Sequence, residues 1–444
     1  MGVILDIIYF FALLAAGPFL LFRMFRYGRY RHNWLQRFGR TPERHGLQPV
    51  IWLHGVSLGE INASRTLVAE LQSQLPDYRV VISSTTDTGM AAAEKAYSPF
   101  LTVFQWPLDF TWAVRRAIRR TQPALVILME GEIWPNFLAE CNRRKIPAVV
   151  VNGRMSPNKG YPRYKKLGLL AAALFNRLTA IGVQDEIYGH KFIELGGEPS
   201  KVHLTGMLKY DTIQVADSVP GQEIIASQLA LDTRAGKLLV AGGTGPGEEQ
   251  ILLEALGKKI TGGELTLLIV PRKPERFDEV ARLITKAGFP CIRRSGHNTH
   301  ATQLQNLPQR AVILGDTMGE LRKFYGLSDM IFVGRSLVHM GGSDMIEAAA
   351  LGKPVCFGPH TFNFPQADDL VRHGCVRVAN GDALRQCVAG WLADGAATAK
   401  AAAETQRYIR SQQGATKRNV ELVCHVLHRV PAVLAGDIAT DELE

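Results

Sequence analysis

The sequence predicts an α/β protein with two doubly wound domains behind an apolar N-terminal helix. Short β-rich apolar runs alternate with helical segments in two separate series. A polar stretch containing proline and glycine, residues 211–223, separates the two series. An uncharged run occupies residues 7–22. The chain has 444 residues, which is long enough for two domains that each bury a core.

The composition is that of a folded protein. Hydrophobic residues make up 46% of the chain and charged residues 21%, which excludes general disorder. The cysteines are scattered singly and form no CxxC pair, so we expect neither a disulfide framework nor a zinc site. A reducing compartment fits best. The cysteines are Cys141, Cys291, Cys356, Cys375, Cys387 and Cys424.

Residues 1–22 are predicted to anchor the chain to a membrane. The segment is apolar apart from Asp6, and six arginines without any acid follow in residues 23–40. Because this charge follows the apolar run, we do not expect a cleaved signal peptide, and the positive-inside rule keeps the remaining chain in the cytoplasm. The run is short and contains Pro18, so a spanning helix and an interfacial helix both remain open.

The net charge of +10 is concentrated in the first half of the chain. Basic runs recur at RRAIRR (115–120), NRRK (142–145) and RMSPNKGYPRYKK (154–166). Such runs are commonly solvated faces, but here they also suit docking on anionic headgroups or on a phosphorylated lipid. We expect no nucleic-acid partner, because no recognised binding motif accompanies the charge.

The first domain is predicted to span residues 23–212. A helix follows its first strand, and alternating strands and helices continue to the end of the domain. The expected strands are residues 50–53, 79–83, 124–128, 147–151 and 180–183.

A linker is expected at residues 213–235 and a second domain at residues 236–400. An Ala-rich helical stretch, roughly 383–430, is expected to cross back onto the first domain, so residues 401–444 form a crossing helix and tail. The carboxyl ends of the strands of both domains would then face a shared cleft. The expected strands are residues 237–241, 265–270, 311–315, 330–334, 354–358 and 376–378.

The turn HGVSLGE (54–60) offers chemistry directly after the first strand. His54, Ser57 and Glu60 stand at the carboxyl end of that strand, where open α/β sheets bind their ligands. A plain structural interpretation also exists, in which Ser57 caps the next helix and Glu60 complements its dipole.

In the second domain, residues 240–256 indicate a strand, a glycine-rich turn and a helix. Pro246 suits the first helical position, with Glu248 and Glu249 in the first turn. The amides of this turn could hold a phosphate, although a tight turn without a ligand would have the same pattern. The glycines are Gly242, Gly243, Gly245 and Gly247.

A similar layout recurs at residues 333–358. Ser343 is the expected N-cap of a helix that stops at Gly352. Glu347 falls within the first helical turn or so, where it either bridges the two hydroxyls of a ribose or compensates the helix dipole.

Two further segments complete the expected anion site. Arg272 and Lys273 leave a strand, and the segment Met318–Gly319–Glu320 begins another helix with free amides. The chain contains no Asp-x-Asp sequence. We therefore expect no metal and no other cofactor, and a leaving phosphate would be stabilised by Arg272, Lys273 and helix N-termini.

These motifs together resemble the Kdo transferases of lipopolysaccharide assembly, which move 3-deoxy-D-manno-octulosonic acid (Kdo) from CMP-Kdo to a lipid A precursor. The resemblance covers nearly the whole chain. It implies a GT-B fold, an inverting metal-independent reaction, and a cell inner-membrane protein whose first domain binds the acceptor and whose second binds the nucleotide sugar. Its motifs are HGVSLGE (54–60), EGEIWPN (130–136), NGRMS (152–156), GMLKYD (206–211), PRKPERF (271–277), DTMGEL (316–321), GGSDMIEAAALGKP (341–354) and GPHTFNF (358–364).

The resemblance assigns Glu60 as the general base, with Ser57 and Gly59 positioning it and the acceptor. His54 is interpreted as a structural hydrogen-bonding residue. Lys209 is our own assignment, to the Kdo carboxylate. The Kdo side of the site is assigned to Glu130, Glu132, Trp134 and Asn136, with a core role left open for Trp134.

On the nucleotide side, the resemblance implies that Arg272 meets the phosphate beside Gly243 and Thr244. It also implies that residues 318–320 form the cytidine-side loop and that Glu347 binds the ribose.

Departures from the family pattern cluster at this donor site. The family usually has serine and histidine where Gly243 and Gly245 stand, histidine at Lys273, and GGHN followed by Glu-Pro where this chain has GGSD and Glu347-Ala348. Asp344 adds negative charge near an anionic donor unless it is paired or faces away. Two alternatives therefore stay open: a transferase of the same fold with a related nucleotide sugar, and an inactive membrane-bound lipid-binding protein.

Overall fold

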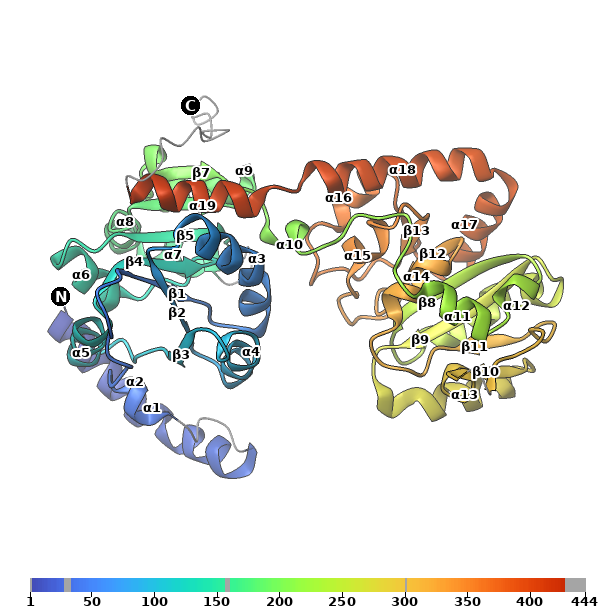
Figure 1. The fold of residues 1–444 in the computed structure, drawn as a ribbon, viewed down its shortest axis with the longest axis horizontal. Helices are drawn as coiled ribbons and strands as arrows, with labels where there is room; N and C mark the ends of the chain where they lie inside the picture. Colours follow the sequence, from blue (N-terminus) through green and yellow to red (C-terminus); the bar gives the residue numbers. More distant parts are fainter. Residues whose placement is uncertain (1, 28–32, 156–159, 300–301, 428–444) are drawn as a thin grey trace. The chain divides into compact units, whose positions relative to one another are not determined.

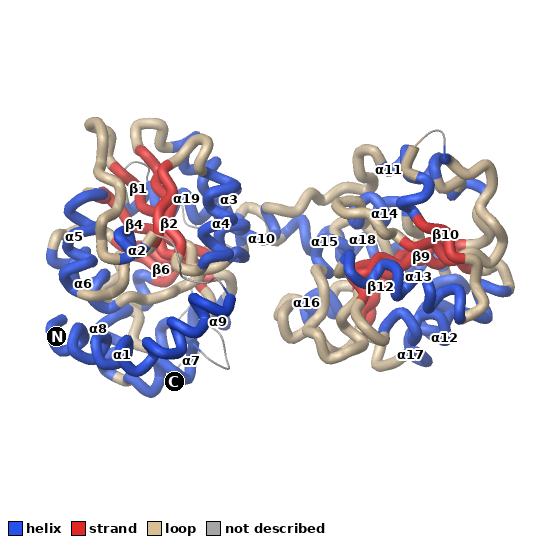
Figure 2. The backbone as a smooth tube through the Cα atoms, turned by 90° about the horizontal axis from the view of Figure 1, so that it is seen from below, coloured by secondary structure: helices blue, strands red, loops and turns tan. Residues whose placement is uncertain are grey.

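Two compact α/β units make up the protein (Figure 1). The computed structural model describes residues 2–27, 33–155, 160–299 and 302–427. One unit contains the described residues up to Thr212 together with those from Gln412 onward, and the other is Ile213–Ser411. Each unit holds a seven-stranded parallel sheet with helices on its faces (Figure 2). This confirms the predicted doubly wound α/β fold behind an apolar N-terminal helix.

The first sheet has the strand order β3-β2-β1-β4-β5-β6-β7. Its interior strand β1 (Val50–His54) is buried along its whole length, as expected for an apolar run covered on both faces. Ile51 and Leu53 pack in one core cluster and Trp52 in the other, because successive side chains point to opposite faces. The other strands are β2 (Arg79–Ser84), β3 (Thr102–Gln105), β4 (Pro123–Met129), β5 (Ala148–Gly153), β6 (Ala180–Val183) and β7 (Val202–Leu204).

The helices of the first unit cover both faces of this sheet. They are α1 (Gly2–Tyr27), α2 (Trp34–Arg37), α3 (Leu58–Gln74), α4 (Asp87–Tyr97), α5 (Thr111–Thr121), α6 (Pro135–Arg143), α7 (Gly160–Leu167), α8 (Leu169–Phe175), α9 (Glu186–Glu194), α10 (Leu208–Asp211) and α19 (Ala415–Val426), with a 3-10 helix at Pro199–Lys201.

The second sheet has the order β10-β11-β9-β8-β12-β13-β14. The central strand β8 (Lys237–Thr244) pairs with β9 on one side and β12 on the other. The other strands are β9 (Leu265–Pro271), β10 (Cys291–Arg293), β11 (Val312–Leu314), β12 (Met330–Val333), β13 (Val355–Phe357) and β14 (Val376–Arg377).

Residues 213–235 were expected to form a linker, but they belong to the second unit and include α11 (Gln222–Gln228). The other helices of this unit are α12 (Glu248–Thr261), α13 (Phe277–Lys286), α14 (Leu321–Leu327), α15 (Met345–Ala349), α16 (Ala367–Arg372), α17 (Gly381–Ala393) and α18 (Gly395–Ser411), with 3-10 helices at Leu231–Thr233, Pro274–Arg276 and Arg294–His297.

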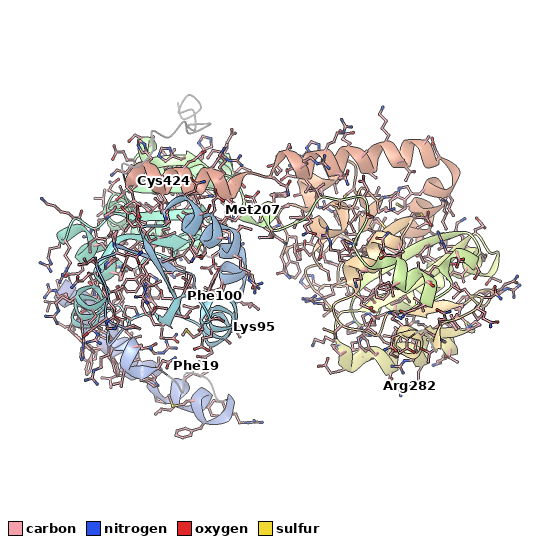
Figure 3. All side chains as sticks on the ribbon, in the orientation of Figure 1. Phe19, Lys95, Phe100, Met207, Arg282 and Cys424 are labelled. Carbon is pink, nitrogen blue, oxygen red and sulfur yellow. The ribbon has the colours of Figure 1, made fainter. Side chains whose placement is uncertain are left out.

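The C-terminal helical stretch is three helices rather than one. Helices α17 and α18 belong to the second unit, whereas α19 belongs to the first. In the first unit α19 packs on α3 and α10, and Figure 3 labels Cys424 on α19 and Met207 just before α10. Asp211 accepts hydrogen bonds from the amides of Gly414 (2.7 Å) and Thr416, so the end of α10 holds the start of α19.

Helix α1 is long and apolar enough to cross a bilayer, by length and composition. Hydrogen bonds also join α1 to the rest of the first unit. Asp6 accepts hydrogen bonds from the Thr111 amide (2.8 Å) and the Asn136 side chain (3.0 Å), and the Tyr9 hydroxyl donates to Asp109 (3.2 Å). Part of the arginine-rich segment, residues 28–32, and Ser156 of the NGRMS motif lie outside the described residues.

Candidate functional site

The turn after β1 holds Glu60 in a capping box. The Ser57 hydroxyl accepts the Glu60 amide (3.3 Å) and donates to one oxygen of the Glu60 carboxylate (2.8 Å). The other carboxylate oxygen accepts the Val56 amide (2.9 Å). Gly59 lies beside Ser57 in the first turn of α3. The structural cap that the sequence left open is therefore present, and the same bonds fix the position of the carboxylate.

Glu60 is buried, with 6% of its surface exposed. Burial raises the pKa of its carboxyl to about 7, and the negative charge of Glu130 and, more weakly, of Glu132 raises it further, against the two hydrogen bonds that lower it. A carboxylate with a pKa near neutrality can accept a proton from a hydroxyl and release it again. The buried position and raised pKa of Glu60 are compatible with proton transfer near neutral pH.

Glu130 and Glu132 follow β4, the strand that pairs directly with β1. The backbone turns sharply there, with φ of 59° at Glu130 and 101° at Gly131. Burial raises the pKa of Glu130, opposed by Arg154, whose Nε donates to its carboxylate at 2.6 Å. Three predicted site residues thus gather at neighbouring strand ends: Glu60, Glu130 and Glu132.

His54 is a structural residue in this geometry. Its ring is buried, stacks on Trp106 at a centroid distance of 3.8 Å, and lies 3.0 Å from the Ser83 hydroxyl and 3.3 Å from the Thr85 hydroxyl. Burial lowers its pKa to about 3. The ring is therefore neutral at physiological pH and does not serve as a cation.

Of the residues that we assigned to the Kdo side, three lie in structural contacts or elements, and for Trp134 this is the core role that the sequence left open. The Asn136 side chain bonds the Asp109 carbonyl (2.6 Å) and Asp6 of α1, so it belongs to the contact that holds α1. Trp134 packs against the core cluster on that face of the sheet. Lys209 lies in α10, whose last residue caps α19.

In the second unit, the glycine-rich turn formed by the last residues of β8 and those that follow it is covered closely by the loop before α15. Gly243 has a φ of 67°, and a Cβ there would come within 2.7 Å of the Ser343 hydroxyl. The Ser343 hydroxyl donates to the Gly243 carbonyl (3.0 Å), and the Arg272 amide donates to the Thr244 carbonyl (3.1 Å). Glycine at position 243 therefore leaves room for the Ser343 side chain beside the end of β8.

Two expected helix starts are wrong. Helix α12 begins at Glu248 with Gly247 as its N-cap, so Pro246 lies before the helix. Asp344, rather than Ser343, caps α15, because its side chain accepts the amides of Ile346 (3.2 Å) and Glu347 (3.4 Å). The Asp344 carboxylate is thus paired with two helix amides, which offsets the negative charge that it adds near the donor site.

Arg272, Asp344 and Glu347 lie near enough to the buried phenol of Tyr325 for their charges to shift its pKa. Burial raises the pKa of Tyr325, the charges of Glu347 and Asp344 raise it further, and Arg272 lowers it. A Cβ at Gly242 would come within 2.1 Å of the same hydroxyl. The structure therefore brings these predicted nucleotide-side residues together beside the glycine-rich turn.

Sequence reasoning missed the roles of the two acids that follow the turn. Glu248 is fully buried and accepts the amides of Gly245 (2.9 Å), Ser336 (2.7 Å) and Leu337 (2.8 Å), and that of Arg335. It thereby ties the turn to the loop after β12. The sequence signal was a pair of acids after glycines, which also fits simple dipole compensation.

Glu249 holds the other side of the turn. It accepts the Thr244 hydroxyl (2.7 Å) and two bonds from Arg276 (2.7 and 3.1 Å). The side chain of Thr244 therefore serves the turn, where we expected a ligand contact.

The segment at residues 318–320 is organised by its acid. Arg294 donates twice to the Glu320 carboxylate (both 3.1 Å), and the Thr317 hydroxyl donates to it as well. Helix α14 begins at Leu321 with Glu320 as N-cap, so Met318 and Gly319 lie in the preceding loop, where Met318 is exposed. Lys273 is exposed beside Arg272.

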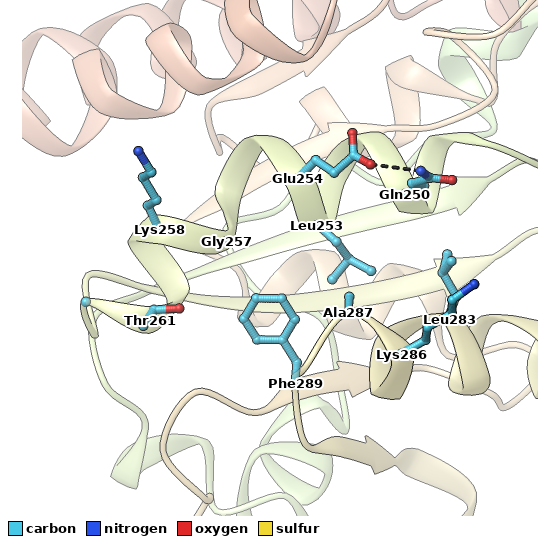
Figure 4. A pocket seen from close by; sticks show the side chains of 11 residues that line it. Gln250, Leu253, Glu254, Gly257, Lys258, Thr261, Leu283, Lys286, Ala287 and Phe289 are labelled. Carbon is cyan, nitrogen blue, oxygen red and sulfur yellow. Dashed lines mark hydrogen bonds between the residues drawn. The ribbon is translucent and has the colours of Figure 1, made fainter.

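A surface hollow of about 830 Å³ lies elsewhere in the second unit, between α12 and α13 (Figure 4). Its polar lining includes Gln250 and Glu254, which bond each other at 2.8 Å. The lining residues lie along the helices and not at the carboxyl ends of the strands, where open α/β sheets bind ligands. We therefore place the candidate site at the strand ends.

Comparison with known proteins agrees with the motifs. Residues 32–212 match the family model of 3-deoxy-D-manno-octulosonic-acid transferase (kdotransferase). The 3-deoxy-D-manno-octulosonic acid transferase of Haemophilus influenzae is 33% identical over 90% of this chain and 93% of its own length, and that of Bordetella pertussis is 31% identical over 87% and 90%.

Solved structures with low sequence identity share the fold. A putative UDP-N-acetylglucosamine 2-epimerase from Listeria monocytogenes superposes with a TM-score of 0.57 at 12% identity, covering 86% of this chain and 98% of its own. A glycosyltransferase from Rickettsia africae gives 0.56 at 14% identity, covering 87% and 100%. These likenesses support the GT-B type of two-unit architecture. The 33% identity to the Haemophilus influenzae transferase extends over nearly the full length of both chains. It shows that this chain belongs to the 3-deoxy-D-manno-octulosonic acid (Kdo) transferase family of glycosyltransferases.

Proposed function

We propose that this protein transfers Kdo from CMP-Kdo to a lipid A precursor, lipid IVA, with inversion at the anomeric carbon and without a metal ion. The observation that carries the proposal is the carboxylate of Glu60, which is fixed by two hydrogen bonds at the end of β1 and has a pKa of about 7. Membership of a Kdo transferase family supports the transferred sugar.

Glu60 would act as the general base. A sugar hydroxyl is a poor nucleophile at neutral pH, so its proton passes to the Glu60 carboxylate as its oxygen attacks the anomeric carbon. The bond from that carbon to the phosphate oxygen breaks on the opposite face, and its electron pair leaves with CMP. Ser57 and the Val56 amide hold the carboxylate in position throughout this step.

The second unit would hold the nucleotide. Arg272 and Lys273, which are both exposed, would supply positive charge beside the glycine-rich turn. Glu347 would bind the ribose, and the loop at residues 318–320 would lie beside the cytosine. These groups stabilise the charge that develops on the leaving phosphate, which is the role that a metal ion has in other transferases.

The first unit would meet the acceptor at the cytoplasmic face of the inner membrane. Helix α1 supplies apolar surface, with exposed side chains that include Ile4, Phe11 and Leu14. Exposed arginines such as Arg115 and Arg143 supply charge for the anionic headgroups and for the phosphates of lipid A.

The proposal is tested by product mass. The full chain in detergent is given CMP-Kdo and tetraacylated lipid A precursor, with and without EDTA. We expect the acceptor to gain mass in whole Kdo units at the same rate with EDTA present. A folded protein that binds UDP in preference to CMP and adds no Kdo would favour a related nucleotide sugar. A chain that binds lipid but no nucleotide would favour the inactive alternative.

A further inference from the structure

We propose that Arg335 binds the phosphate of the nucleotide donor, on the side of the glycine-rich turn opposite Arg272. The inference rests on the proposed function and extends it, because no motif of the family resemblance assigns a role to this residue. Arg335 follows β12 and is one of the few residues other than glycine with a left-handed backbone, at a φ of 58°.

The strand order places Arg335 at the expected binding crevice. Strand β8 lies between β9 and β12, and the chain proceeds from β8 first to β9 and later to β12 on its other side. Ligands of doubly wound sheets bind outside the carboxyl ends of the strands at such a switch point. The Arg272 amide bonds the Thr244 carbonyl (3.1 Å), and the Gly334 amide bonds the Gly242 carbonyl (2.9 Å). The two arginines therefore flank the turn that begins at Gly243.

The backbone of Arg335 is held by a specific contact. Its amide donates to the buried carboxylate of Glu248, which also accepts the amides of Ser336 and Leu337. A left-handed conformation is unfavourable for a side chain with a Cβ and is common for glycine. An arginine at this position is therefore costly for the fold, and the fold alone does not require its guanidinium.

The side chain lies along the turn. A Cβ at Gly245 would approach the Arg335 Cγ to 3.2 Å, so the absence of a side chain at position 245 gives the arginine its room. One terminal nitrogen, Nη2, donates to the Met340 carbonyl at 3.3 Å. The Nε atom is buried and has no hydrogen-bond partner among the described residues. No carboxylate in the described part of the chain forms an ion pair with this guanidinium.

A phosphate would accept the hydrogen bonds that the Arg335 guanidinium does not make within the described part of the chain. A buried guanidinium donor without a partner is unfavourable, and the planar guanidinium offers paired N–H groups that match two phosphate oxygens. The carboxylate of Kdo has the same chemistry. We assign the phosphate because the Arg335 side chain lies along the same glycine-rich turn that Arg272 borders, and Arg272 is the residue proposed to hold the phosphate.

The test compares two arginines that share a backbone conformation. Arg335→Gly removes the guanidinium and also relieves the left-handed strain, so the melting temperature should stay the same or rise. Arg310→Gly is the matched control, because Arg310 has the same left-handed backbone, with a φ of 60°, and is exposed. It precedes β11, so it lies at the amino ends of the strands, away from the carboxyl ends where Arg335 stands. Binding of CMP and of cytidine is measured by calorimetry on the full chain in detergent.

We expect Arg335→Gly to weaken CMP binding by about tenfold or more, the effect of losing a charged hydrogen bond, and to leave cytidine binding unchanged. Arg310→Gly should change neither. Wild-type affinity for CMP in Arg335→Gly would overturn the inference and leave the proposed function standing. A higher KM for CMP-Kdo with unchanged CMP affinity would assign Arg335 to the Kdo carboxylate and also overturn it. Absence of CMP binding by the wild type would overturn both.

Discussion

Glu60 combines a structural and a chemical role in one side chain. As the last residue of a capping box it satisfies the Val56 amide, and its buried position raises its pKa to about 7. Burial outweighs the two hydrogen bonds, which favour the charged form. Because the folded pKa lies above the usual 4.5, the ionisation of Glu60 opposes folding: its contribution to stability is complete below about pH 4.5 and is lost as pH rises through 7.

This titration predicts the pH dependence of transfer. The base must be ionised, so kcat/KM should fall about tenfold per pH unit below about pH 7 and level off above it. Ser57→Ala removes a hydrogen bond that lowers the pKa, so the inflection should move to higher pH. Initial rates of CMP release across this range measure both. A flat profile, or an inflection that stays in place in Ser57→Ala, would contradict the role of Glu60 as the titrating base.

At the scale of elements, the turn between β8 and α12 depends on two buried acids. Glu248 ties it to the loop after β12, and Glu249 ties it to Arg276. The pattern GEE was visible in the sequence, but Arg276 and Ser336, which the two acids bind, lie 27 and 88 residues away along the chain. Only the sheet order brings them together, so local sequence reasoning assigned these acids to the helix dipole.

Loss of the Glu249 carboxylate should destabilise the second unit. Glu249→Ala leaves Arg276 buried without its main partner, which typically costs about 3–5 kcal/mol. Glu279→Ala is the matched control, because Glu279 contacts the same guanidinium from an exposed position and should cost about 1 kcal/mol or less. Urea unfolding followed by circular dichroism gives both values. Equal small losses would show that the buried pair does not stabilise the turn.

The predicted and the missed strands differ in burial. Interior strands such as β1 and β8 begin with apolar runs that the sequence identified. Strand β1 was predicted to within one residue, whereas β8 continues three residues further than predicted, through Thr244. The three missed strands, β3, β7 and β10, are all sheet edges. Their sequences, TVFQ, VHL and CIR, are short and partly polar because one side of an edge strand has no neighbour.

The site residues also divide into those that the sequence predicted and those that it missed. Glu130 and Arg272 directly follow strands, and Glu60 stands in the motif that joins β1 to α3, so their location could be predicted from the sequence. The contact of Asn136 with α1 and the position of Arg335 depend on hydrogen bonds between distant segments, which no local pattern encodes. The capping role of Asp344 is local, because the amides that it accepts lie two and three residues ahead. It was missed because the neighbouring Ser343 is an equally suitable N-cap.

At the scale of the whole molecule, the chain passes between the two units twice. It leaves the first unit after Thr212 and returns at Gln412, so α19 completes the first unit from the far end of the sequence. Val420, Leu422 and Val423 of α19 are buried in the core cluster of Ile51 and Leu53. The first unit therefore cannot bury its core from residues 1–212 alone.

Truncation should reveal this dependence. Removing residues 412–444 exposes three core positions, each worth about 1.5–3 kcal/mol, which is comparable with the total stability of a domain. We expect this variant to unfold or aggregate. Removing residues 428–444 leaves α19 intact and should keep the melting temperature within a few degrees. A soluble, cooperatively melting chain that ends at residue 411 would contradict the assignment of α19 to the first core.

The most direct test of the central claim is the rate of Kdo transfer by Glu60→Gln. Glutamine keeps the capping box and removes only the ability to accept a proton, so at pH 8 the variant should melt no lower than the wild type and bind CMP equally well. Transfer to the lipid A precursor should fall by about 100-fold or more. Transfer near the wild-type rate in this folded, CMP-binding variant would show that Glu60 is not the base.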